Sequence, residues 1–122
     1  MTNILLDSNV IIALAKGILS TSVLDEKRIR VSEMNRLEVF GYHKLSEEEN
    51  NALSRFFENI ICLEISVKII DGAIALRQAN KMSVGDAIIA ATALRFDLRI
   101  YTANIDDFKH IQGLNYINPF KI

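Results

Sequence analysis

The sequence predicts an α/β domain in which helices cover a parallel β-sheet. Short β-prone runs alternate with helical segments along the chain, and strands separated by helices favour a parallel, layered arrangement. Residues 4–6 (Ile-Leu-Leu) are continuously apolar, as expected of a central strand covered on both faces. Residues 84–94 are apolar on nearly all sides, which predicts a helix packed deep against the sheet.

The length and composition predict one domain. The chain has 122 residues, of which 50% are hydrophobic, and a chain of this length buries roughly two thirds of its unfolded surface. Its one proline and five glycines mark no boundary, so we expect residues 1–122 to form a single domain.

The expected elements follow one another in a regular order. After the strand at 4–6 we expect strands at 29–31, 61–65, 99–102 and 115–117. We expect helices at 8–16, 33–44, 66–80 and 84–94, another after the capping box at residues 46–49 (Ser-Glu-Glu-Glu), and a short one at 105–110. The helix at 66–80 has a broad apolar face that consists of Val67, Ile70, Ile74, Ile69, Ala73 and Leu76.

Charge and cysteine content exclude several classes of protein. Lys and Arg number 14 against 15 Asp and Glu, a net charge of −1, so no strongly basic field indicates a nucleic-acid partner. An enzyme that acts on polyanions through metal ions is still compatible with this balance. Cys62 is the only cysteine, which excludes an intramolecular disulfide and fits a reducing cytoplasm. We expect no membrane segment or signal peptide, because no apolar run reaches roughly 18 residues and the first residues are not basic.

Two acidic residues are predicted at the carboxyl edge of the sheet, where parallel sheets place their ligand sites. Asp7 directly follows the strand at 4–6, and a role as the N-cap of the next helix is an equally good interpretation. Glu38 shares a helix face with Met34, Leu37 and Gly41. It therefore faces the interior, unless it reaches water at the rim.

Further polar residues are expected at the same edge. Asp86 is the only charged residue between 83 and 94; it either completes a capping box with Ser83 or adds an oxygen ligand, and it can do both. The short loop near 97–98 makes this helix antiparallel to the next strand, so the helix starts at the carboxyl edge. Asn104, Asp106 and Asp107 follow the strand at 99–102, where they either form a site or cap the short helix.

These acids together predict a divalent cation. Carboxylates this close repel one another, and a hard cation relieves the repulsion. Oxygen ligands favour Mg²⁺ or Mn²⁺ over zinc, which prefers His and Cys. His43 and His110 have no partner at ligand spacing, and Cys62 is better explained as a packing residue than as a nucleophile.

Four motifs resemble those of PIN-domain ribonucleases. Residues 4–12 (ILLDSNVII) resemble the family's opening strand and turn, and Ser32, Asn35 and Glu38 resemble its Ser-x-x-Thr-x-x-Glu motif, with Asn35 in place of the usual threonine. Residues 85–93 (GDAIIAATA) and 102–108 (TANIDDF) resemble the third and fourth motifs. The match runs from residue 3 to residue 120, and the small size looks most like the VapC toxins of type II toxin–antitoxin pairs.

The resemblance implies a three-layer α/β/α domain with a parallel sheet of about five strands. It also implies a cytoplasmic endoribonuclease that depends on Mg²⁺ or Mn²⁺, forms homodimers and is inhibited by a small antitoxin. Asp7, Glu38, Asp86 and Asp107 would hold the metal, with Asn104 as a further catalytic residue. Ser8 and Thr102 would orient the carboxylates.

Other interpretations stay open at this point. A catalytically weak or inactive module could use the same acidic pocket to bind a protein partner. RNA contacts would come from local cations, for which Lys27, Arg28, Arg30, Arg36, Lys44, Arg95 and Arg99 are the candidates.

Overall fold

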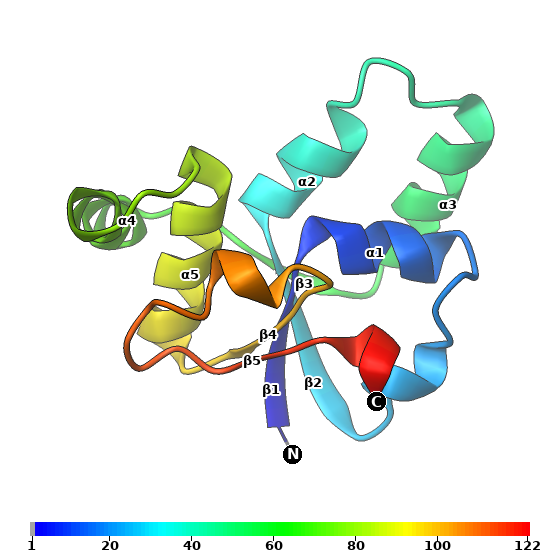
Figure 1. Cartoon of the computed structure of the whole chain (residues 1–122). Helices are drawn as coiled ribbons and strands as arrows, with labels where there is room; N and C mark the ends of the chain where they lie inside the picture. The colour runs from blue at the N-terminus through cyan, green and yellow to red at the C-terminus, as the bar shows by residue number, and fades with distance from the viewer. Residues whose placement is uncertain (1) are drawn as a thin grey trace.

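Five parallel strands form the centre of the computed structural model, which describes residues 2–122 (Figure 1). The strands are β1 (Thr2–Leu6), β2 (Lys27–Ser32), β3 (Ile61–Leu63), β4 (Arg99–Tyr101) and β5 (Tyr116–Ile117). Their order across the sheet is β3-β2-β1-β4-β5, and every neighbouring pair is parallel. The chain moves outward from β1 in one direction and then in the other, so a topological switch point lies beside β1.

Helices cover both faces of this sheet, which confirms the three-layer α/β/α prediction (Figure 1). The α-helices are α1 (Ser8–Ala15), α2 (Glu33–Phe40), α3 (Glu47–Phe57), α4 (Val67–Ala79) and α5 (Val84–Phe96). Three short 3-10 helices are η1 (Thr21–Leu24), η2 (Ile105–Asp107) and η3 (Pro119–Lys121). No helix within residues 2–122 has the length and apolarity that a membrane crossing requires.

The continuously apolar strand β1 joins the two halves of the core. Ile4, Leu5 and Leu6 are all fully buried. Ile4 and Leu6 pack into the cluster formed with α1 and α3, whereas Leu5 packs into the cluster on the side of α5, against Ile89 and others. Successive side chains of a strand point to opposite faces, so both layers are anchored on β1.

Several boundaries differ from the sequence prediction. Helix α2 ends at Phe40, with Gly41 as its C-cap, and not at residue 44. The expected helix at 105–110 is a 3-10 turn over residues 105–107. Half of the apolar face predicted for α4 is uncovered: Ile69 and Ala73 are buried against α5, but Val67 is 77% exposed. The reason is that α4 packs mainly on α5, so the apolar residues on its other side are exposed to solvent.

Candidate active site

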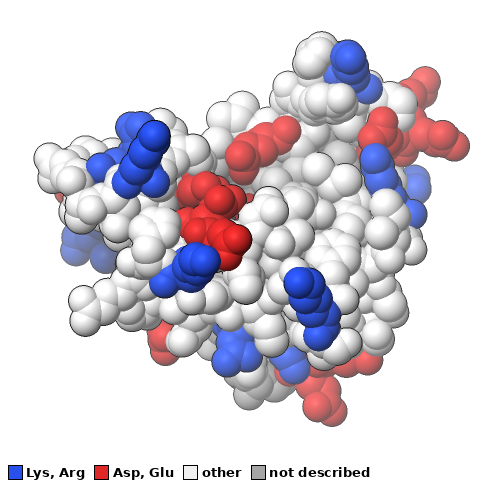
Figure 2. Space-filling view, viewed as in Figure 1, with Lys and Arg blue, Asp and Glu red and all other residues white. Residues whose placement is uncertain are grey.

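Acidic side chains gather on one face of the molecule, over the carboxyl ends of the strands (Figure 2). They come from four segments that are distant in the sequence: the end of β1, helix α2, the start of α5 and the turn after β4. The parallel sheet brings these segments together because all its strands end at the same edge.

Asp7 is the most firmly held of the acids. It is the N-cap of α1, and its Oδ1 accepts a hydrogen bond from the Ser8 backbone N–H at 2.9 Å. Its Oδ2 accepts from the Thr102 hydroxyl at 2.8 Å and from the Asn9 amide at 3.2 Å. Burial nevertheless raises the pKa of Asp7, the charge of Asp107 raises it further, and the hydrogen bonds oppose this rise. Asp7 therefore caps α1 and also lies at the carboxyl edge of the sheet, in contact with Thr102.

The turn after β4 is tied to the turn after β1 by polar contacts. The Thr102 hydroxyl accepts from the Asn104 backbone N–H at 3.0 Å while it donates to Asp7. The Ala103 backbone N–H donates to Asn9 Oδ1 at 3.0 Å. Asn9 was not singled out from the sequence, although it belongs to the Asp-Ser-Asn motif. The Asn9 amide contacts Asp7 through Nδ2 and the turn after β4 through Oδ1.

Glu38 reaches the site through a chain of hydrogen bonds that begins at a buried amide. Asn35 is fully buried, and its Oδ1 accepts from the Ser32 backbone N–H at 2.7 Å. Asn35 Nδ2 donates to Ser8 Oγ at 3.1 Å, and Ser8 Oγ donates to Glu38 Oε1 at 2.8 Å. Burial of its carboxyl raises the pKa of Glu38, and the nearby charge of Asp7 adds to this effect.

The sequence pattern placed Glu38 inward because it shares a helix face with Leu37, and this reason was wrong. Leu37, assigned to the same apolar face, is 66% exposed, and the buried residues of α2 are Asn35 and Val39. Glu38 is instead positioned by Gly85 of α5: a Cβ at residue 85 would lie 3.0 Å from Glu38 Oε2. The missing side chain at Gly85 lets the carboxylate of α2 rest against the start of α5.

Asp86 stands next to Gly85 in the first turn of α5. Its backbone N–H donates to the Ser83 hydroxyl at 3.1 Å, so Ser83 caps this helix as expected. Burial raises the pKa of the Asp86 carboxyl, and the charges of Asp107, Asp7 and Glu38 raise it further, in that order. The pKa of Asp86 therefore depends on carboxylates from three other segments at this edge of the sheet.

The structure separates the three polar residues that follow Thr102. The charge of Asp107 acts on both Asp7 and Asp86, whereas Asp106 forms an ion pair with Lys109 at 3.0 Å. Asn104 precedes η2 but does not cap it with its side chain, and its side chain is exposed to solvent. Of the two residues considered for completing the site, Asp107 has the stronger electrostatic link to it.

The donor set fits a hard divalent cation. All of its members are carboxylate oxygens. Burial first, and the charge of neighbouring carboxylates second, raise the pKa values of Asp7, Glu38 and Asp86, and a bound cation would offset the repulsion. Among residues 2–122, no three His, Cys, Asp or Glu side chains already converge as a metal cage. Glu38, the longest of these side chains, is turned toward Ser8.

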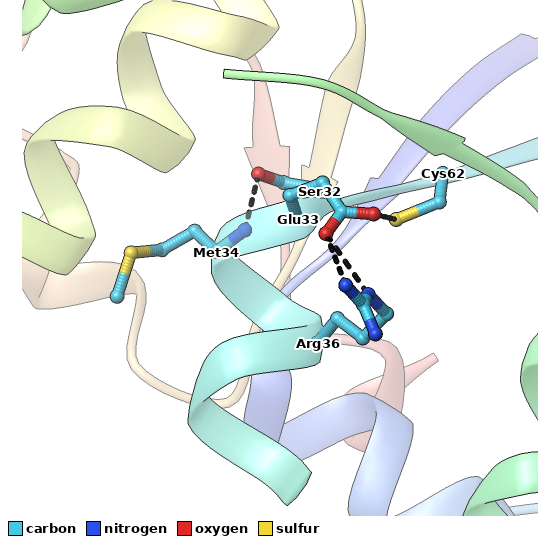
Figure 3. Close-up of polar contacts among 5 residues, drawn as sticks. All are labelled: Ser32, Glu33, Met34, Arg36 and Cys62. Carbon is cyan, nitrogen blue, oxygen red and sulfur yellow. Dashed lines mark hydrogen bonds and ion pairs between the residues drawn. The ribbon is translucent and has the colours of Figure 1, made fainter. Parts of the chain in front are cut away.

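The single cysteine, Cys62, contacts the start of α2 and is not part of the acidic site (Figure 3). Ser32 Oγ accepts from the Met34 backbone N–H at 2.9 Å, which caps the helix. The Cys62 thiol donates to Glu33 Oε1 at 3.1 Å, and Arg36 pairs with Glu33 Oε2 at 2.9 Å. Burial and the Glu33 carboxylate raise the pKa of Cys62 to about 12, so the thiol is no nucleophile at neutral pH.

Comparison with known proteins identifies the family. A family model described as PIN domain matches residues 4–114. A toxin–antitoxin complex from Klebsiella pneumoniae contains a chain that is 30% identical, with a TM-score of 0.81 and coverage of 98% of this chain and 99% of that one. No curated protein matches the sequence significantly.

Two further structures share the fold at lower identity. A chain of the VapBC complex from Rickettsia felis, bound to a DNA fragment from its promoter, is 21% identical with a TM-score of 0.81, over 96% of this chain and 98% of that one. A chain of a VapBC complex from nontypeable Haemophilus influenzae is 22% identical with a TM-score of 0.75, over 98% and 99%. The family match and the sheet topology agree: this chain belongs to the PIN-domain family.

Proposed function

We propose that this protein is a metal-dependent endoribonuclease and the toxin of a toxin–antitoxin pair. The observation that carries the proposal is the position of Asp7, Glu38, Asp86 and Asp107, which come from four separate segments and lie over one edge of a PIN-type sheet. The assignment as a toxin rests on the likeness to the Klebsiella pneumoniae complex, which covers nearly the whole of both chains.

Asp7, Glu38, Asp86 and Asp107 would hold Mg²⁺ or Mn²⁺, directly or through water. When bound, such an ion lowers the pKa of a water molecule and stabilises the charge that develops on the phosphodiester. Thr102 and Asn9 fix the orientation of Asp7, and Ser8 fixes that of Glu38. Glu38 is turned toward Ser8 in the metal-free chain, so its side chain would have to rotate for all the carboxylates to reach one cation.

We propose two kinds of protein partner. We assign an antitoxin as the first, by likeness to the complexes named above, with the cytoplasm as the site of action. The second is another copy of this chain, whose docking would cover the apolar stripe left open by α4 and the start of α5. That stripe consists of Val67, Ile70, Ile74 and Val84, all of them exposed.

RNA cleavage tests the proposal. We expect single-stranded RNA to be cut with Mg²⁺ or Mn²⁺, to survive in EDTA, and to survive with Asp86→Asn. Asp97→Asn is the matched control, because Asp97 is exposed at the C-cap of α5, at the opposite end of that helix from Asp86; it should cut like the wild type. Activity that persists in EDTA or in Asp86→Asn contradicts the proposal. Cation binding without any cleavage supports instead the inactive module that receives a protein partner in its acidic pocket.

A further inference from the structure

A cleft of about 500 Å³ opens beside the acidic site, between the α4–α5 connection and the segment that follows β4. Its lining consists of Arg77, Lys81, Met82, Ser83, Asp86, Asp106, Asp107 and His110. The volume lies within the range of about 300–1,000 Å³ that is usual for small-ligand sites. Asp86 and Asp107 belong both to this cleft and to the acidic site, so a ligand in the cleft lies next to the proposed reaction centre.

The other side of the cleft is basic. Arg77 Nε donates to the Met82 carbonyl at 3.2 Å, which holds the guanidinium against the α4–α5 connection and leaves its terminal nitrogens free to donate. Within residues 2–122, neither Arg77 nor Lys81 forms an ion pair, although Lys109 pairs with Asp106 on the opposite side. Figure 2 shows Lys and Arg on the α4–α5 side of the acidic patch.

Four of the seven cations that the sequence suggested for RNA lie away from the acidic site or are already paired. Lys27, Arg28 and Arg99 are at the amino ends of β2 and β4, at the sheet edge opposite to the acids. Arg36 is on α2 but is neutralised by Glu33. Arg77 and Lys81 are therefore the unpaired cations that share a cleft with the acidic site.

We propose that this cleft binds the nucleotide next to the scissile bond of an RNA substrate, with Arg77 and Lys81 on its phosphate. This inference rests on the proposed function and adds a substrate subsite to it. Arg and Lys are the usual donors to phosphate oxygens, and a guanidinium can donate to two of them at once. His110 provides a flat ring on which an unpaired base can stack. Because Asp86 and Asp107 repel a phosphate, the subsite fills efficiently only when a divalent cation neutralises them.

The test measures binding and cleavage of a fluorescently labelled, single-stranded RNA oligonucleotide in Mg²⁺. We expect Arg77→Gln with Lys81→Gln to weaken binding by about 10-fold or more, and the salt dependence to become shallower by about 0.7 in log–log slope for each lost phosphate contact. Where RNA is cleaved, KM should rise while kcat changes little. The charge-conserving pair Arg77→Lys with Lys81→Arg should retain most of the binding.

Arg28→Gln with Arg99→Gln is the matched control, because it removes the same charge at the opposite edge; it should bind RNA like the wild type. Equal losses in both double variants would show a general charge effect and overturn the subsite. Unchanged KM and RNA affinity in the Arg77–Lys81 variant would also overturn it, even if that variant binds a protein partner more weakly. RNA binding that depends on Arg77 and Lys81 without any cleavage would keep the subsite and contradict the proposed hydrolysis.

Discussion

Asn35 is the buried residue on which the start of α2 depends, and Asn35→Ala tests that dependence. Its Oδ1 is the partner of the Ser32 backbone N–H at 2.7 Å, and Ser32 is 1% exposed. The substitution leaves this N–H buried without an acceptor, which costs about 1–3 kcal/mol. The small void left by the amide adds about 1 kcal/mol, and the better helix propensity of Ala returns a few tenths. We therefore expect a loss of about 2–3 kcal/mol.

Urea unfolding followed by circular dichroism measures this loss. With an m value of about 1–3 kcal/mol/M for a small domain, the midpoint should fall by about 0.7–3 M while m stays constant. Asn51→Ala is the matched control, because Asn51 is exposed in the middle of α3; it should change stability by less than about 0.5 kcal/mol. If both variants unfold at the same midpoint, Asn35 does not have the structural role that its contacts indicate.

Three further predictions concern Gly85, Asp7 and Cys62. Gly85→Ala places a Cβ 3.0 Å from Glu38 Oε2 and should push this flexible carboxylate away. We expect the Mn²⁺ affinity, measured by titration, to fall about 10-fold or more while the melting temperature is unchanged or higher. An unchanged Mn²⁺ affinity would contradict this prediction. Burial raises the pKa of Asp7, so protonated Asp7 is favoured in the folded state. In EDTA, the wild type should therefore lose stability relative to Asp7→Asn as pH rises from about 4 through that raised pKa. Urea unfolding at several pH values measures this, and a stability difference between the two proteins that does not change with pH would refute it. Cys62, with a pKa of about 12, should react with iodoacetamide at pH 8 roughly 1,000-fold more slowly than a thiol of pKa 9, and mass spectrometry after timed quenching would expose a faster reaction.

Local patterns were sufficient to predict the layers of the fold. The apolar run of Ile4, Leu5 and Leu6 predicted a central strand, and the structure places it in the middle of the sheet with each of these side chains fully buried. Ser46 and Glu49 predicted a capping box, and both of its hydrogen bonds form. Such signals depend on neighbours in the sequence, which is why they could be read without coordinates.

The supporting contacts of the site could not be predicted in this way. The importance of Gly85 depends on the approach of Glu38 from another helix, 47 positions earlier in the chain. Asn35 appears in the sequence as an exception to a motif, but its value lies in the contact with Ser8, which the fold alone creates. Local periodicity also misplaced Leu37, because α2 is a short helix at the edge of the sheet and buries only a narrow stripe.

Mn²⁺ binding to the metal-free protein tests the central claim most directly, since it measures the acidic site without assuming a substrate. Electron paramagnetic resonance of free Mn²⁺ during a titration gives the affinity for the wild type and for Asp7→Asn, Asp86→Asn, Asp107→Asn and Asp106→Asn. We predict saturable binding that each of the first three substitutions weakens at least 10-fold, whereas Asp106→Asn binds like the wild type. Binding that is equal in all four variants, or no saturable binding by the wild type, would contradict the assignment of these carboxylates as a cation site.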